Sequence, residues 1–307
     1  ASFPWLSHQP VRIGEAEGTM IRVSYVGELG WEIHLPNAYL KAAYEKIRSA
    51  GQAHGLRHFG MYAMNSLRLE KCYRSWKADL STDYTMLAGA LAQKMHAPNL
   101  VSVFEFGGTG AILEELPLAV GERRTFHKAL AASGLSDIVE TAQRGFIEYG
   151  FLGGAQIDPY GNLNSTVIGD HDNPKVRLPG SGGGNDVGSH CWRTIAIMQH
   201  DKRRFIEKVD FITTPGYLSG PGTREAAGLP PGTGPYRVVT TLAVLGYHPE
   251  SKRMLLLATQ PGVTVEQIIE NTGFELLIAD EVTENPPPSA EELRILREEV
   301  DKEKFYI

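Results

Sequence analysis

The sequence predicts a chain built mainly as an α/β fold, with a smaller α+β segment in front of it. From about residue 86 onward, short apolar runs alternate with helical stretches and glycine turns, which is typical of a layered sheet with helices between its strands. The first 85 residues instead indicate a β-hairpin followed by helices. At 307 residues the chain is long enough for two domains of ordinary size. We therefore expect two parts, residues 1–85 and residues 86–307.

The first part begins with strand signals. "TMIRVSYVG" alternates apolar and polar residues, and the turn "GELG" leads into "WEIHLP", which indicates a hairpin. A helix is predicted over residues 37–51, because apolar residues recur there at helical spacing. We expect Asn37 to cap this helix and Gly51 to end it. "MYAMNSLRLEKCYRSW" indicates a second helix.

The second part begins with a helix of small residues, "LAGALAQKM", which Pro98 is expected to stop. "DPYG" at Asp158–Gly161 predicts a type I turn between two strands. Ser289 and Glu292 form a capping-box signature for a C-terminal helix. The long Gly/Pro-rich connection Thr214–Pro235 has a length that is often functional or packed by another chain. The expected strands are Val101–Phe106, Phe151–Ile157, Thr194–Met198, Val209–Thr213, Tyr236–Leu245 and Met254–Ala258.

The composition favours a soluble, cytoplasmic protein. Hydrophobic residues make up 42% of the chain and charged residues 21%, and the net charge is -6, which gives no sign of a nucleic-acid partner. No apolar run approaches the roughly 20 residues that a bilayer span needs, and the N-terminus lacks a signal-peptide pattern. Cys72 and Cys191 are far apart, with no CxxC, which fits a reducing compartment.

Glu105 is the most unusual residue of the pattern. It lies in the apolar run "VSVFEF" that ends on two glycines. A carboxylate buried without a partner is costly, so such a group is often neutral or takes part in chemistry. The alternative from spacing alone is an edge-strand glutamate whose carboxylate reaches water.

A second candidate feature is the glycine-rich stretch "RLPGSGGGNDVGSH". Gly180–Gly184, interrupted by Ser181, could point backbone amides at an anion. The stretch is neither a Walker loop nor a dinucleotide fingerprint, and a structural turn explains it as well. An amide nest next to a nucleophilic carboxylate would be what acyl transfer needs.

Other motifs carry less weight. His54 and His58 are four residues apart, but Gly55 between them weakens a helix. Asp170–Asp172 looks like a metal motif, yet its Gly and Pro neighbours favour a polar turn, so no metal is expected. There is no GxSxG for a serine hydrolase. The basic cluster Lys202–Arg204 is interpreted as a solvated face, with contact to the phosphates of a ligand as the alternative.

From about residue 87 to the C-terminus, the chain resembles the β subunits of glutaconate CoA-transferases, which are family I CoA-transferases. The motifs that carry the resemblance are "HAPNLVSVFEFG", "GGAQIDPYGNLNSTVIGD", "KVRLPGSGGGND", "MQHDKRRFIEKVDFITTPGY", "GPYRVVT" and "ENTGFEL". The resemblance implies a three-layer α/β/α open sheet and an enzyme that moves coenzyme A from an acyl-CoA thioester to a small carboxylic acid, with a dicarboxylic acid favoured. It also implies a separate α subunit that completes the site.

The resemblance also assigns roles to residues. Glu105 matches the nucleophile, which forms an acyl-glutamyl anhydride and then a glutamyl-CoA thioester in a ping-pong reaction. Asn164 matches a polar active-site position and could orient Glu105 or the substrate, and the amides of Gly182 and Gly183 are expected to stabilise the oxyanion. Phe106 replaces a small residue of the glutaconate enzyme. The residues expected to contact coenzyme A or substrate are Gly107, Gln156, Ser181, Gly184 and Asn185.

Residues 1–85 resemble an interior part of the folate-binding aminomethyltransferase fold, in the version attached to dimethylglycine and sarcosine dehydrogenases. "RVSYVGELGWEIHLP" and "GLRHFGMYAMNSLRLEKCYRSWKADLSTDYT" carry this resemblance. It implies that Glu28 and, with a weaker match, Arg68 face a tetrahydrofolate. The half of that fold with the catalytic aspartate has no counterpart here, so folate chemistry is the least favoured function.

The two resemblances meet at Thr85–Leu87 without a linker, and the opening helix and strand of the β-subunit pattern are absent. Three alternatives to a CoA-transferase therefore stay open. The same fold could hydrolyse an acyl-CoA or open a ring, with Glu105 as general base or as an anhydride opened by water. The chain could be a non-catalytic fusion or chimera. It could finally carry out folate-dependent transfer.

Overall fold

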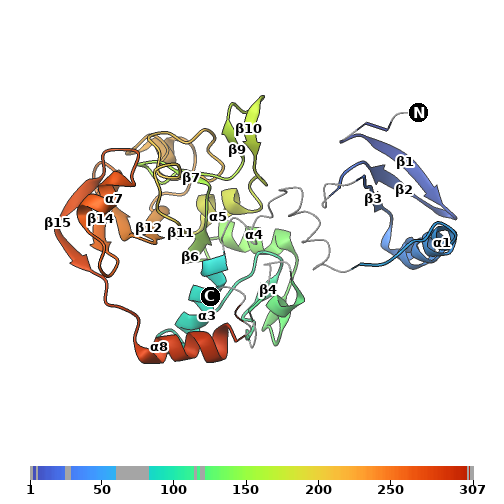
Figure 1. Ribbon diagram of the computed structural model, residues 1–307, viewed down its shortest axis with the longest axis horizontal. Helices are drawn as coiled ribbons and strands as arrows, with labels where there is room; N and C mark the ends of the chain where they lie inside the picture. Colours follow the sequence, from blue (N-terminus) through green and yellow to red (C-terminus); the bar gives the residue numbers. More distant parts are fainter. Residues whose placement is uncertain are drawn as a thin grey trace. The chain divides into compact units, whose positions relative to one another are not determined.

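The computed structural model describes residues 3–4, 6–24, 29–59, 83–113, 116–117, 122–302 and 304. Two compact units make up the chain, Ala1–Arg74 and Ser75–Ile307 (Figure 1). The boundary expected between residues 85 and 86 stays a prediction about domain organisation.

The described residues of the first unit form a three-stranded antiparallel sheet and helix α1. Its strands β1 (His8–Ile13), β2 (Ala16–Ile21) and β3 (Glu32–His34) lie in sequence order, which confirms that the chain turns back between β2 and β3. A 3₁₀ turn η1 (Asn37–Tyr39) leads into helix α1 (Leu40–Gln52). Asn37 is inside η1 and Pro36 precedes it, so the expected capping role of Asn37 is wrong. The helix expected at residues 61–76 falls outside the described residues.

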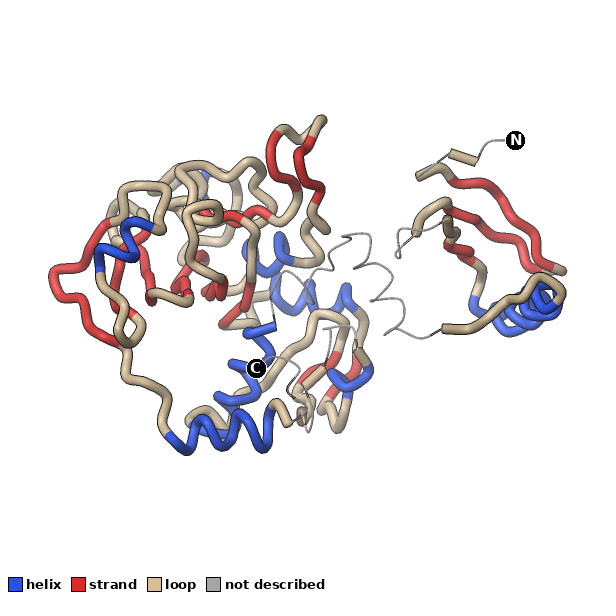
Figure 2. Tube along the Cα trace, viewed as in Figure 1, coloured by secondary structure: helices blue, strands red, loops and turns tan. Residues whose placement is uncertain are grey.

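The second unit is built on a mixed six-stranded sheet, drawn in red in Figure 2. The order is β15-β14-β13-β12-β11-β6. Strand β11 is parallel to both β6 and β12, β13 is antiparallel to its two neighbours, and β14 is parallel to β15. The strands are β6 (Tyr149–Leu152), β11 (Arg193–Met198), β12 (Gly234–Thr240), β13 (Ala243–Tyr247), β14 (Met254–Thr259) and β15 (Leu277–Glu284).

Among the described residues, two-stranded antiparallel sheets and several helices complete this unit. The strand pairs are β4 (Gly108–Thr109) with β5 (Ala131–Ala132), β7 (Gln156–Ile157) with β8 (Leu163–Asn164), and β9 (Val167–Gly169) with β10 (Pro174–Arg177). The helices are α3 (Asp83–Met95), η2 (Arg123–Phe126), α4 (Leu135–Gln143), α5 (Gly184–His190), α6 (Thr223–Ala226), α7 (Val265–Glu270), α8 (Ala290–Ile295) and the π-helical η3 (Leu296–Val300).

The predicted strands are confirmed where the apolar run is buried in the main sheet. Thr194–Met198 and Met254–Ala258 lie within β11 and β14. The run Tyr236–Leu245 is divided between β12 and β13, and Phe151–Ile157 between β6 and β7. Val209–Thr213 is not a strand, because the amide of Asp210 bonds to the Gln156 side chain and only Thr213, at the end of the run, bonds to the backbone of β8.

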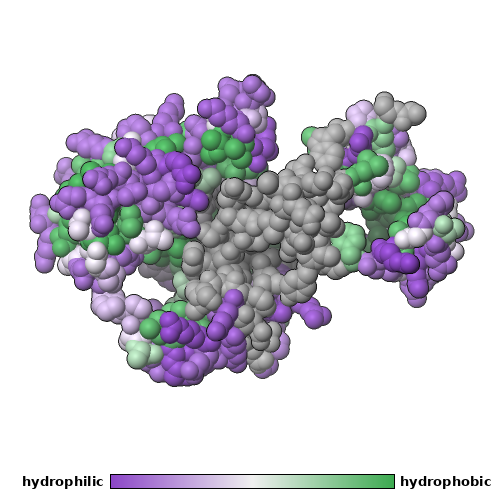
Figure 3. Space-filling model, in the orientation of Figure 1, coloured by the Kyte–Doolittle hydropathy of each residue, from purple (hydrophilic) through white to green (hydrophobic). Residues whose placement is uncertain are grey.

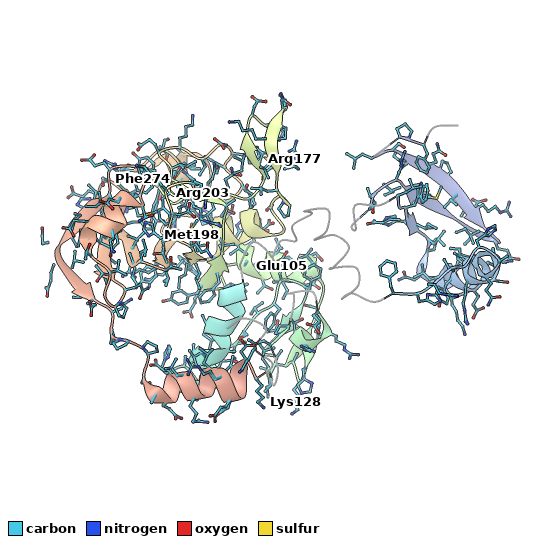
Figure 4. All side chains as sticks on the ribbon, in the orientation of Figure 1. Glu105, Lys128, Arg177, Met198, Arg203 and Phe274 are labelled. Carbon is cyan, nitrogen blue, oxygen red and sulfur yellow. The ribbon has the colours of Figure 1, made fainter. Side chains whose placement is uncertain are left out.

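The main core lies on one face of the large sheet. Met198, Val238, Leu245 and Leu256 from four neighbouring strands pack there with Ile268 of α7, and all are at most 3% exposed. Figure 4 labels Met198 and Phe274 within this core.

Helix α5 packs against β6, β11 and β12. Gly150 of β6 allows this approach, because a Cβ atom there would overlap the side chain of Val187 on α5. The sheet therefore fixes α5, and α5 begins at the glycine-rich stretch.

A smaller core joins the ends of the second unit. Ala90 of α3 packs with Ile295 of α8, and Lys94 forms an ion pair of 3.1 Å with Glu299. Ser289 caps α8 and exchanges hydrogen bonds with Glu292, which confirms the predicted capping box.

The visible surface of the second unit is largely hydrophilic, with apolar patches between the charged side chains (Figure 3). None of the described helices has the length and apolar character that crossing a bilayer requires.

Candidate active site

Glu105 lies at the tip of a tight turn and not within a strand. The amide of Gly107 donates to the carbonyl of Phe104 at 2.9 Å, and Val103 pairs with Thr109 across the turn. The expected strand Val101–Phe106 is therefore wrong, because the backbone reverses after Phe104. The turn leaves Glu105 half-buried and Phe106 48% exposed, and Figure 4 labels Glu105.

The two glycines after Glu105 are required by close packing of the backbone. A Cβ atom on Gly107 would overlap the carbonyl of Ser133, and one on Gly108 would overlap the carbonyl of Thr125. Gly107 also has φ +119°, which other residues adopt rarely. These contacts clamp the Glu105 turn on both sides. Gly107 is buried, and its contact with substrate stays a prediction.

The glycine-rich stretch forms a left-handed turn that leads into α5. Gly180, Gly182 and Gly183 have φ values of 98°, 51° and 86°. Ser181 closes the turn, because its carbonyl accepts from the amide of Gly184 at 2.8 Å and its hydroxyl accepts from the amide of Asn185 at 2.9 Å. The side chain of Ser181 is thus committed to the turn itself.

The two features predicted separately from the sequence meet in space. A Cβ atom on Gly183 would lie 2.7 Å from Cδ of Glu105 and closer still to Oε1, so the carboxylate rests against the glycine backbone. Within the described part of the chain, the amides of Gly182 and Gly183 donate to no protein acceptor. A carboxylate beside uncommitted amides is an arrangement that can attack a carbonyl and stabilise the resulting oxyanion.

Asn164 and Gln156 take part in one hydrogen-bond network. Asn164 is 0% exposed and donates to Gln156 Oε1 and to the carbonyl of Val167, both at 2.6 Å, while its Oδ1 accepts from the amide of Thr166. Gln156 in turn donates to Asp210 at 2.9 Å. Asn164 therefore does not orient Glu105 by a direct hydrogen bond, because its amide group is already committed to this network.

The structure adds residues that sequence reasoning missed. The hydroxyl of Ser165 donates to the carbonyl of Gly180, and the amide of Gly180 donates to the carbonyl of Ser165, both at 2.8 Å. The hydroxyl of Thr213 accepts from the amide of Ser165, and the carbonyl of Thr213 accepts from the side chain of Asn185 at 3.2 Å. Asn185 is itself exposed. In the sequence, Ser165 and Thr213 each belong to a pair of small polar residues, and such pairs are too common in proteins to indicate a site.

Two other predicted motifs lie apart from this site. Arg203 and Arg204 contact Asp201 at 3.4 Å and 3.1 Å, and Figure 4 shows Arg203 well separated from Glu105. The carboxylate of Asp170 accepts from the amides of Asp172 and Asn173, which confirms a polar turn between β9 and β10.

The described residues give no sign of a metal site. No group of three metal-ligating side chains converges among the described residues. Glu28 and Arg68, the predicted folate contacts, fall outside the described residues. The first unit contains an apolar pocket of about 300 Å³ between β3 and α1, and Ile33, Ala43, Tyr44 and His58 are among the residues that line it.

Comparisons with known proteins match the two parts of the chain to different families. A coenzyme A transferase model matches residues 87–271, and a model of the GCVT N-terminal domain matches residues 1–96. The B subunit of glutaconate CoA-transferase from Acidaminococcus fermentans is 37% identical over 74% of this chain and 87% of its own length. The B subunit of 3-oxoadipate CoA-transferase from Pseudomonas knackmussii is 38% identical over 68% of this chain and 81% of its own length.

A solved structure and a mammalian enzyme complete the comparison. The crystal structure of glutaconate coenzyme A-transferase from Acidaminococcus fermentans aligns with a TM-score of 0.70 and 37% identity, over 73% of this chain and 87% of that one. The N-terminal part is similar to mitochondrial dimethylglycine dehydrogenase of Rattus norvegicus, at 42% identity over 29% of this chain. This chain spans only 10% of the length of that dehydrogenase.

Proposed function

This chain belongs to the coenzyme A transferase family, and we propose that it is the subunit that supplies the nucleophile, Glu105. The observation that carries the proposal is the contact between the Glu105 carboxylate and Gly183, next to the uncommitted amides of Gly182 and Gly183. The nucleophile and the oxyanion donors of an acyl transfer must lie within one reacting group of each other, and this contact meets that condition.

The proposed reaction begins when a Glu105 carboxylate oxygen attacks the thioester carbonyl of acyl-CoA. The tetrahedral oxyanion accepts from the amides of Gly182 and Gly183, and collapse of the intermediate expels the coenzyme A thiolate and leaves an acyl-glutamyl anhydride. One such donor contributes on the order of 10²–10³ in rate. The thiolate then attacks the Glu105 carbonyl, which releases the first carboxylate and forms the glutamyl-CoA thioester.

A second carboxylic acid repeats these steps in reverse. Its carboxylate attacks the glutamyl thioester and expels the thiolate, and the thiolate attacks the new acyl carbonyl. The products are the second acyl-CoA and the regenerated Glu105 carboxylate. Since the first acid leaves before the second reacts, the kinetics are ping-pong.

Further features belong to the same proposal. Small carboxylic acids, with a dicarboxylic acid favoured, are the proposed acceptors, and Phe106 beside the nucleophile borders the acyl group. An α-type subunit is the proposed partner, because the similar proteins are B subunits. Ser181 and Gly184 shape the turn that faces the substrate, and Asn164 and Gln156 support it from within. A cytoplasmic location fits the cysteine usage, and tetrahydrofolate is not a reactant in this scheme.

Steady-state kinetics tests the proposal on the chain co-expressed with an α-type subunit taken from a glutaconate-type CoA-transferase. Parallel double-reciprocal lines for acyl-CoA and acid are expected, with a new acyl-CoA formed only when an acid is present and no free coenzyme A released. Glu105→Gln should lower the exchange rate by about 10³-fold or more. Glu140→Gln, a change of similar type on the exposed face of α4, should leave it unchanged. Steady release of coenzyme A without an acid would contradict a transferase and favour a hydrolase.

A further inference from the structure

Two glycines one turn apart make a groove on α5. Gly184 and Gly188 lie on the same face of the helix, because residues at i and i+4 are neighbours there. Glycine inside a helix costs about 1 kcal/mol relative to alanine, so a pair of them in a seven-residue helix calls for a packing reason. The groove supplies that reason, since it is filled from outside the helix.

The residue that fills the groove is Thr214. A Cβ atom on Gly184 would lie 3.0 Å from Thr214 Oγ1, and one on Gly188 would overlap the Cγ2 methyl of Thr214. The side chain of Thr214 therefore lies between the two glycines, and the residue is only 4% exposed. As a β-branched residue, threonine is stiff at χ1, which makes this contact rigid.

The backbone of Thr214 is fixed on its other side to β8. Thr214 donates to the carbonyl of Leu163 and accepts from the amide of Leu163, both at 3.0 Å. The next residues along β8 lead to Ser165, which is bonded in both directions to Gly180 at the start of the glycine turn. Both ends of the turn are thus anchored to one strip of backbone, Gly180 through Ser165 and α5 through Thr214.

We infer that Thr214 is a positioning residue for the transfer reaction. Its side chain fixes the distance between α5 and β8, and this holds Gly183 and the uncommitted amides against Glu105. The inference rests on the proposed function for its activity readout. Thr214 acts through α5 and makes no contact with the reacting atoms. Since a displacement of about 1 Å between reacting groups costs on the order of 10²-fold in rate, a change in this contact should lower kcat with little effect on KM.

The test introduces a steric clash with one substitution and removes it with a second. The kinetic constants are measured on the full chain co-expressed with the α-type subunit. Gly188→Ala places a methyl group on the Thr214 methyl and should lower kcat by about 10- to 100-fold, with KM for acyl-CoA changed by less than about threefold. Thr214→Ser removes Cγ2, so the double variant should recover most of the lost kcat. Gly89→Ala is the matched control, because a Cβ atom there meets nothing within 4 Å.

Hydrogen exchange separates this inference from the proposed function. The amides of residues 184–190 should exchange faster in Gly188→Ala and return toward the wild-type rate in the double variant, whether or not the protein transfers coenzyme A. If the wild type forms no covalent intermediate while exchange behaves in this way, the proposed function fails and the contact stands. Wild-type kcat and exchange in Gly188→Ala, or a loss of kcat that Thr214→Ser does not relieve, would overturn the inference.

Discussion

The carboxylate of Glu105 rests on the α-carbon of Gly183, so closely that a Cβ atom on Gly183 would lie 2.7 Å from Cδ of Glu105. These residues are far apart in the sequence, and glycines hold both of them in place. Glu105 is held by a turn clamped through Gly107 and Gly108, and Gly183 has φ +86°. Because of this contact, Gly183 has a role that Gly182 does not share, and substitutions can distinguish the two.

Gly183→Ala should therefore be much more damaging to activity than Gly182→Ala. Both changes place alanine at a positive φ, which costs about 1–2 kcal/mol of stability in each case. Only the Gly183 variant pushes Glu105 aside, because a Cβ atom on Gly182 meets nothing within 4 Å. We expect the transfer rate to fall by about 10²-fold more in Gly183→Ala. Equal rates in the two variants would contradict the contact.

Asn164→Ala should reduce stability more than chemistry. The change removes a fully buried side chain and leaves the amide of Thr166 and the carbonyl of Val167 without that partner. The free energy of unfolding in urea should fall by about 2–4 kcal/mol, while kcat per folded molecule stays within about threefold. Asn173→Ala in the exposed β9–β10 turn is the control and should cost less than about 0.5 kcal/mol. Full stability with lost kcat would instead make Asn164 a substrate contact.

A substitution of the buried Arg224 should also cause a large loss of stability. The guanidinium is 1% exposed and donates to the carbonyls of Gly188 and Ser189 at the end of α5 and of Pro215 and Gly216. An ammonium group cannot reach this planar set of acceptors. Arg224→Lys should therefore lower the free energy of unfolding by about 3 kcal/mol or more. The same change at Arg203, whose side chain is 92% exposed, should have no measurable effect.

Two buried groups should give stability opposite dependences on pH. Burial lowers the pKa of His200 to about 4, so as the pH falls from 6.5 the unfolded chain takes up a proton that the folded chain excludes. The free energy of unfolding therefore falls by up to about 3 kcal/mol by pH 4. Burial raises the pKa of Asp158 to about 6, so the folded chain binds a proton first and gains stability as the pH falls from 6 towards 3.8.

The two contributions largely cancel in the wild type between pH 6 and pH 4. His200→Gln should remove only the first, so its free energy of unfolding should rise relative to that of the wild type as the pH is lowered over this range. Urea unfolding of both proteins at pH 7, 5.5 and 4.5 measures the difference. A difference between the two proteins that is constant with pH would show that His200 does not titrate as described.

How far the sequence predicts the fold depends on burial in the main sheet. The runs that became β11 and β14 are apolar and bounded by turn residues, so local pattern and tertiary environment agree. Val101–Phe106 and Val209–Thr213 carry the same pattern, yet their backbones bond to a tight turn and to a side chain. An apolar pattern that repeats every two residues indicates a possible strand. It does not indicate which hydrogen-bond partners the backbone finds.

The candidate site was predictable in its components and not in its arrangement. Glu105 and the glycine turn stand out by composition, and the resemblance to CoA-transferase β subunits joins them. Asn164 was expected to orient Glu105 or the substrate. Its hydrogen bonds go to Gln156, Thr166 and Val167, which the sequence does not indicate, and its contact with the substrate stays a prediction. Thr214 carries no signal at all, because its role depends on two glycines of a helix well before it in the chain, and only the folded contact reveals it.

Mass spectrometry of the Glu105 peptide tests the central claim most directly. The chain, co-expressed with an α-type subunit from a glutaconate-type CoA-transferase, is incubated with acyl-CoA without an acceptor acid and then digested. We predict a coenzyme A adduct on the peptide that contains Glu105, present in the wild type and absent in Glu105→Ala. An unmodified Glu105 peptide from protein that binds acyl-CoA would contradict covalent transfer through this residue.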